Sequence, residues 1–176
     1  NDTAIAGVKM KREDIMKRLR GKKGTKVRLT VVRRGIADRL TFVVTRDKIP
    51  VKTIDAAYMI RPKIGYIRIG SFGATTYEEF MEGVDSLKRH GMRGLILDLQ
   101  ENGGGYMQSA VQIANEFLRK NDLIVYTEGR ASRRREYSAD GKGKLLDERV
   151  VVLVNEYSAS AAEIVTGALQ DQDRAQ

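Results

Sequence analysis

Hydrophobic positions near the start of the chain follow a short helical period and then alternate along two runs. Residues 11–21 predict a helix, with Ile15 and Leu19 on one face. Residues 26–32 and 38–44 predict two strands, and the glycine-containing segment between them predicts a hairpin. Their alternating apolar side chains are Val27, Leu29 and Val31, then Leu40, Phe42 and Val44. A helix followed by a hairpin is a small α+β unit, which we expect to be incomplete.

After residue 50 the pattern changes to strands that alternate with amphipathic helices. The predicted strands are 64–72, 93–99, 122–129 and 149–156, and the predicted helices are 75–91, 109–120 and 158–171. The inward positions are Phe80, Val84 and Leu87 in the first helix, and Val111, Ala114 and Leu118 in the second. The continuously apolar run at 93–99 indicates a strand buried on both faces. This alternation predicts a three-layer α/β domain with much parallel pairing.

Charge is unevenly distributed along the chain. Residues 1–50 contain 15 Lys/Arg against 5 Asp/Glu, whereas residues 51–176 contain 17 against 18. A basic segment joined to a near-neutral remainder predicts two units, and we expect them to span 1–48 and 49–176. Hydrophobic residues make up 41% of the 176, enough to bury a core. The longest apolar run, at 150–154, is far too short to span a bilayer.

Cysteine is absent from the chain, and His90 is the single histidine. Disulfides, zinc–thiolate sites and thiol catalysis are therefore excluded, and a site with several histidines is disfavoured. We expect neither a metal nor an organic cofactor. His90 lies before a predicted strand, at the opposite end from the candidate site described next, so we interpret it as a solvated turn residue.

Two predicted strand-to-helix turns could carry chemistry, DLQENGGG at 98–105 and VNEYSASAAE at 154–163. Both follow buried strands and precede helices, so both offer unpaired N–H groups at the edge where α/β folds place their sites. A serine on such a sharp turn is held out for attack, which suits acyl transfer. The N–H of Ala161 could donate to an oxyanion, and a second donor could come from the glycine turn.

Each of these features also has an ordinary interpretation. Ser160 and Glu163 have the spacing of a capping box, so Ser160 could simply cap a helix. The glycine turn could be only flexible. Arg133, Arg134 and Arg135 are interpreted as a solvated face rather than a nucleic-acid site, because no aromatic interleaving accompanies them. A nucleophilic serine also needs a base, and no lysine follows Ser160 in this chain.

In their order along the chain, these motifs resemble the carboxy-terminal processing proteases, also called tail-specific proteases. Residues 155–175 resemble that family's nucleophile segment, and residues 98–105 resemble its glycine turn. Residues 1–45 resemble the second half of its PDZ domain. The resemblance implies a partial PDZ domain at 1–48, with the groove helix and closing hairpin. It implies a crotonase- or ClpP-like protease core at 49–176, truncated at its C-terminal end.

The resemblance also implies a Ser-Lys dyad in which Ser160 is the nucleophile and Ser158 a structural neighbour. The oxyanion hole would consist of backbone N–H groups of Ala161 and of Gly104 or Gly105. The family's lysine sits roughly 25 residues after the serine, beyond residue 176 here, so we expect this chain alone to be inactive.

By the same resemblance, the function is that of a serine endopeptidase that recognises and degrades proteins from apolar C-terminal tails. The partners are proteins or peptides with a free C-terminus, and the location is extracytoplasmic, in the periplasm or at a membrane. Membrane association through a segment upstream of Asn1 and homo-oligomerisation stay open. The alternatives are a non-catalytic peptide-binding scaffold of the same architecture and, from the basic first segment, a nucleic-acid-binding protein. The latter is disfavoured because no RNA- or DNA-reading signature is present.

Overall fold

A computed structural model describes residues 3–47 and 52–176 of the chain. The chain divides into two compact units, Asn1–Val51 and Lys52–Gln176. The boundary expected between residues 48 and 49 lies outside the described residues.

The first unit contains helix α1 (Arg12–Leu19) and an antiparallel pair, β1 (Lys26–Val31) and β2 (Leu40–Thr45). The helix and the hairpin lie where the sequence predicts them, and the apolar side chains pair across the strands, as Leu29 does with Phe42. Arg46 joins the two parts, since its guanidinium donates to the carbonyl oxygens of Arg18 and Leu19 at 3.1 and 2.7 Å. No residue of α1 is buried and Phe42 is 44% exposed, so the described residues of this unit enclose no core.

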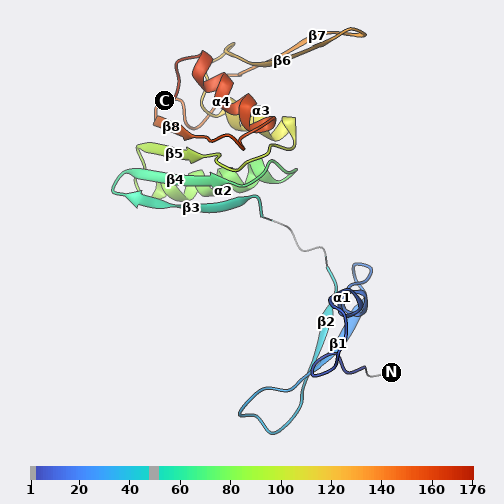
Figure 1. Cartoon of the computed structure of the whole chain (residues 1–176). Helices are drawn as coiled ribbons and strands as arrows, with labels where there is room; N and C mark the ends of the chain where they lie inside the picture. Colours follow the sequence, from blue (N-terminus) through green and yellow to red (C-terminus); the bar gives the residue numbers. More distant parts are fainter. Residues whose placement is uncertain (1–2, 48–51) are drawn as a thin grey trace. The chain divides into compact units, whose positions relative to one another are not determined.

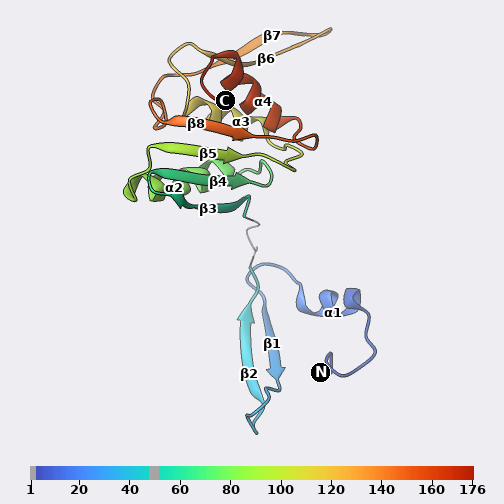
Figure 2. The ribbon, with the colours of Figure 1, turned by 60° about the vertical axis from the view of Figure 1, so that its left-hand side comes forward.

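The second unit is built around a four-stranded sheet (Figure 1). Its elements are β3 (Ile54–Arg61), β4 (Ile64–Ile69), α2 (Thr76–Arg89), β5 (Gly94–Asp98), α3 (Met107–Asn115), β6 (Leu123–Gly129), β7 (Ser132–Ser138), β8 (Arg149–Leu153) and α4 (Ala161–Asp171). The strand order is β3-β4-β5-β8, with β4, β5 and β8 parallel and β3 antiparallel at one edge. Strands β6 and β7 form a separate antiparallel hairpin, which extends past α3 and α4 (Figure 2).

One face of the sheet packs against helices and forms the core. Leu95 and Leu97 of β5 point to that face and are almost wholly buried, together with Phe80, Val84 and Leu87 of α2. The inward face predicted for α2 is therefore confirmed. In α3, by contrast, Ala110 and Ile113 are buried while Val111 is half-buried. Ala114, and Leu118 just after the helix, are buried as predicted.

The prediction that β5 is buried on both faces is wrong. Side chains alternate along a strand, and the second face carries Tyr66 of β4, Ile96 of β5 and Val151 of β8 as cross-strand neighbours. Tyr66 and Ile96 are only half-buried, and Val151 is 41% exposed. Helices α2, α3 and α4 of this unit lie on the other face (Figure 1), so helices cover one face of the sheet here rather than both.

Candidate active site

The two turns singled out from the sequence lie side by side because they follow neighbouring parallel strands, β5 and β8. Several hydrogen bonds join them. The N–H of Leu99 donates to the Leu153 carbonyl at 2.9 Å, the N–H of Ala159 donates to the Asn102 carbonyl at 3.0 Å, and the Ser158 hydroxyl donates to the Leu99 carbonyl at 2.7 Å. The turn that carries Ser160 is therefore held against the glycine turn along its length.

Asn102 organises the glycine turn, and sequence reasoning missed it. Its side chain is fully buried, and its Nδ2 donates to the carbonyl oxygen of Ile69 at 2.7 Å. Its Oδ1 accepts the N–H of Gly104 at 2.8 Å. A buried amide with both ends satisfied specifies one backbone path. The available signal was an asparagine directly before three glycines, a residue type that bonds to its own backbone in turns.

Asn155 plays a similar part at the outer side of the two turns. Its Oδ1 accepts the N–H of Glu101 at 2.9 Å, and its Nδ2 donates to the Glu101 carboxylate at 2.8 Å. Glu101 has a positive φ of 62°, a conformation that side chains rarely adopt without support. The bonds from Asn155 provide that support, so residues of one turn stabilise the backbone of the other.

The glycine turn requires glycine at two positions. Gly104 has a φ of +95°, and a Cβ added there would lie 2.7 Å from the Cβ of Ser160. Gly105 has a φ of +138°, and a Cβ there would lie 2.0 Å from the carbonyl oxygen of Phe72. A Cβ on Gly103 would meet nothing within 4 Å. Gly104 thus permits the backbone of this turn to come into direct contact with Ser160.

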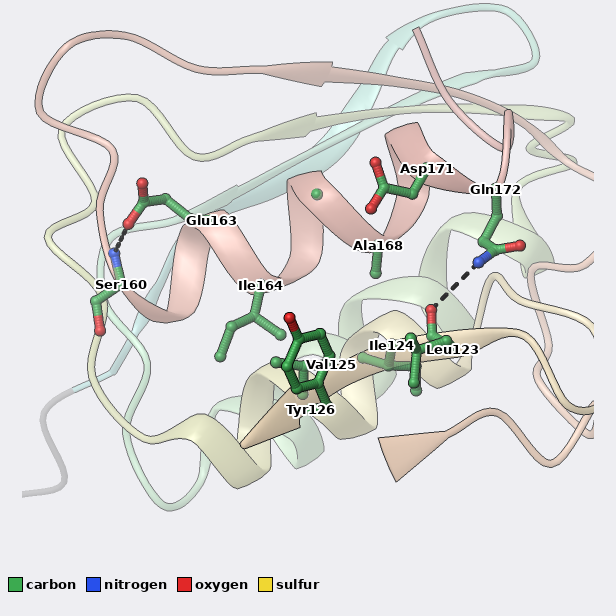
Figure 3. A pocket seen from close by; sticks show the side chains of 11 residues that line it. Leu123, Ile124, Val125, Tyr126, Ser160, Glu163, Ile164, Ala168, Asp171 and Gln172 are labelled. Atoms are coloured by element: carbon green, nitrogen blue, oxygen red, sulfur yellow. Dashed lines mark hydrogen bonds between the residues drawn. The ribbon is translucent and has the colours of Figure 1, made fainter. Parts of the chain in front are cut away.

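Ser160 has a strained backbone at the first turn of α4. Its φ and ψ are 56° and −113°, whereas a residue that only caps a helix normally has extended backbone. The predicted capping box with Glu163 is present, and the Glu163 carboxylate accepts the N–H of Ser160 at 2.6 Å. In Figure 3 the Ser160 hydroxyl points away from that carboxylate. Capping alone does not require positive φ, and such strain concentrates at functional sites.

The backbone donors near Ser160 differ in their availability. Among the described residues, the N–H groups of Ala161 and Gly105 have no hydrogen-bond partner. The N–H of Gly104 is already bonded to Asn102. Ala161 is the first residue of α4, where the helix dipole favours negative charge. One unpaired N–H therefore directly follows Ser160 and another lies in the glycine turn that contacts it, and unpaired backbone donors are what an oxyanion site requires.

A groove of about 480 Å³ extends from Ser160 between α4 and β6 (Figure 3). Ile164 and Ala168 of α4 face Val125 and Tyr126 of β6 across it. Its other lining residues are Leu123, Ile124, Glu163, Gly167, Asp171 and Gln172. The walls are mainly apolar, the two charged lining residues are acidic, and Ser160 lies at one end.

His90 and the run of three arginines both lie at the protein surface. His90 is exposed at the end of α2 and lies near the start of β5, as predicted for a solvated turn residue. The three consecutive arginines are exposed on β7, also as predicted. No aromatic residue is interleaved among them in the sequence, but folding brings rings to two of them. The guanidinium of Arg134 lies 3.8 Å from the ring centroid of Tyr126, because β6 pairs with β7 in the hairpin. The guanidinium of Arg135 lies 5.0 Å from the ring centroid of Tyr137, two residues further along β7.

Within residues 3–47 and 52–176, acidic, histidine and cysteine side chains form no group of three that could hold a metal ion. None of the helices in the same residues is long and apolar enough to cross a membrane.

A strained serine on a strand-to-helix turn, at the edge of a mainly parallel sheet, is an arrangement typical of serine hydrolases. Residues 63–176 match the family model described as Peptidase family S41. The chain belongs to that family.

Carboxyl-terminal processing proteases are similar to this chain over most of its length. The carboxy-terminal processing protease CtpA of Bacillus subtilis (strain 168) is 40% identical over 153 residues, 87% of this chain and 32% of the relative. A carboxyl-terminal-processing protease of Synechocystis is 39% identical over 161 residues, 90% of this chain and 37% of the relative. The chain thus spans about a third of the length of these relatives.

Among solved structures, the photosystem II D1 C-terminal processing protease is similar, with a TM-score of 0.61 and 27% sequence identity. The match covers 93% of this chain and 45% of that chain. The mixed α/β fold seen here is therefore one that a carboxyl-terminal processing protease adopts.

Proposed function

We propose that this chain supplies the nucleophile and oxyanion site of a serine endopeptidase that cleaves proteins near their C-termini. The single observation that carries the proposal is the strained backbone of Ser160, held at the start of α4 with Gly104 in contact. The names of the relatives support it, because they are carboxyl-terminal processing proteases. A residue that only caps a helix does not need this strained backbone.

The chemistry would proceed by an acyl-enzyme. The Ser160 Oγ attacks the scissile carbonyl carbon, and its proton passes to a neutral lysine amine. The oxyanion rests on the N–H groups of Ala161 and Gly105, while the N–H of Gly104 would serve only after leaving Asn102. The C–N bond breaks as the lysine returns the proton to the leaving amine. Water then hydrolyses the ester and restores the serine hydroxyl.

The base would be a lysine of the longer protein. No lysine follows Ser160 within the 176 residues, and no basic residue lines the groove beside it. Burial against apolar surface would keep such an amine neutral, because desolvation disfavours its charged form. We therefore expect no turnover from the 176-residue chain alone.

The finer architecture is also part of the proposal. The helix and hairpin of the first unit would be the second half of a PDZ domain, which captures an apolar C-terminus by strand addition. Their exposed apolar side chains, such as Phe42, support an incomplete domain. The second unit would be the crotonase- or ClpP-like core. The extracytoplasmic location, and any membrane association or homo-oligomer, rest on the family resemblance alone.

The test compares wild-type full-length gene product with Ser160→Ala on an unfolded protein that ends in an apolar C-terminus. Cleavage by the wild type and none by Ser160→Ala is the expected result. A Thr166→Ala variant, on the same helix but outside the groove, is the matched control and should cleave like the wild type. Equal cleavage by wild type and Ser160→Ala would show that Ser160 only caps α4.

A further inference from the structure

The groove between α4 and β6 begins at Ser160, so it lies where a substrate chain would continue from the scissile bond. We propose that this groove binds an extended substrate peptide and selects apolar side chains at its second and fourth residues from the scissile bond. The inference rests on the proposed function, because it takes Ser160 as the point of cleavage.

The spacing of the helix matches that of an extended peptide. Ile164 and Ala168 lie one and two turns beyond Ser160 on the groove side of α4, about 6 and 12 Å along the axis at 1.5 Å per residue. An extended peptide advances about 3.3 Å per residue, so its second and fourth residues lie about 7 and 13 Å from the scissile bond. Side chains two residues apart point to the same side of a strand. Both can therefore face the apolar wall of α4.

Strand β6 offers the means of holding such a peptide. It pairs only with β7 among the described residues, so its other edge has backbone groups that can bond to an added strand. The Leu123 carbonyl of β6 already accepts one such bond, from the amide of Gln172 just after α4, at 3.4 Å. Val125 and Tyr126 would line the side-chain sites from the strand. The occupant is thus a peptide with backbone groups free to pair.

The composition of the lining favours apolar side chains over acidic ones. Glu163 and Asp171 are the two charged lining residues, so a substrate carboxylate near them would be repelled and desolvated. Gly167 keeps the groove open, because a Cβ added there meets nothing within 4 Å. A larger residue at 167 would fill the groove without straining the helix.

The experiment measures binding separately from catalysis. Full-length protein with Ser160→Ala is titrated with fluorescent peptides that carry Leu or Asp at each of four positions on both sides of the scissile bond. A peptide with Leu at its second or fourth position from the scissile bond should bind at least tenfold more tightly than the same peptide with Asp there. This difference should appear on one side of the scissile bond only. Adding Gly167→Leu should weaken the affinity for the Leu peptides at least tenfold. The affinity for peptides with Gly at those positions should change by no more than about threefold. Gln170→Leu, on the exposed face of α4 outside the groove, should change neither affinity.

Equal affinity for Leu and Asp peptides, or no effect of Gly167→Leu on the Leu peptides, would overturn the groove proposal. Turnover by the enzyme with wild-type Ser160 is measured in parallel and reports on the proposed function. If turnover is absent but binding follows the predicted pattern, the peptide groove stands and the catalytic role fails. Turnover could instead depend on Ser160 while staying the same whether the peptide carries Leu or Asp at these positions and whether Gly167→Leu is present. The catalytic role then stands and the groove proposal fails.

Discussion

Removing the side chain of Asn102 should destabilise the second unit far more than removing a surface asparagine with the same number of bonds. Asn102→Ala leaves the N–H of Gly104 and the carbonyl of Ile69 without side-chain partners in a buried place. Each buried unsatisfied group costs about 1–3 kcal/mol. The expected loss in the free energy of unfolding is therefore about 2–6 kcal/mol.

Asn115 is the matched control. Its Nδ2 donates to Asp140 Oδ1 at 3.0 Å and its Oδ1 accepts the N–H of Asp140 at 2.8 Å, both at the surface. Water can replace these bonds, and alanine favours the helix in which Asn115 lies, so Asn115→Ala should cost about 1 kcal/mol or less. The difference between the variants isolates the effect of burial.

The assay is urea unfolding of the 176-residue chain followed by circular dichroism, with the midpoint and the slope compared between variants. Amide hydrogen exchange at Gly104 adds a local measure, because loss of its acceptor should accelerate exchange at that residue. If Asn102→Ala costs no more than Asn115→Ala, and exchange at Gly104 is unchanged, the reasoning that Asn102 holds the glycine turn is refuted.

Three further predictions concern backbone strain and pH. Ser160→Gly should raise the free energy of unfolding by about 1 kcal/mol, since relief of about 1–3 kcal/mol of strain exceeds the entropic cost of glycine; a lower urea midpoint would favour a simple cap. Gly105→Ala should lower the free energy of unfolding by at least about 2 kcal/mol in the same assay, because its Cβ would clash with Phe72. Gly103→Ala should change it by no more than about 0.5 kcal/mol, because its Cβ would meet nothing. Similar losses for the two variants would contradict the geometry of the turn. Burial raises the pKa of Glu79, but hydrogen bonds from the backbone and hydroxyl of Thr53 and other donors outweigh it and hold the pKa below its ordinary value. This stabilisation is present above the unfolded pKa and is lost as pH falls through the folded value, so Glu79→Gln should flatten the acid limb of a stability–pH curve; an unchanged limb would disprove the link.

Much of the second unit could be predicted from its sequence because burial imposes a period on apolar residues. Phe80, Val84 and Leu87 recur at helical spacing and form the buried face of α2. The hairpin strand β7 was missed because almost all of its side chains are exposed, so no alternation of apolar residues marks it. The second face of β5 was wrongly expected to be buried, since Ile96 is apolar but has no helix against it among the described residues.

The sequence alone indicated most of the strands and helices in their order and singled out the two turns, because glycines and small polar residues after apolar runs mark where strands end. Only the tertiary structure placed those turns in contact, since parallel pairing of β5 with β8 joins residues that are far apart in the chain. It also decided the strained φ of Ser160 and the buried bonds of Asn102. The asparagine before three glycines signals a turn but not its buried bonds, and the strain has no sequence signature, because both depend on neighbours that folding brings together.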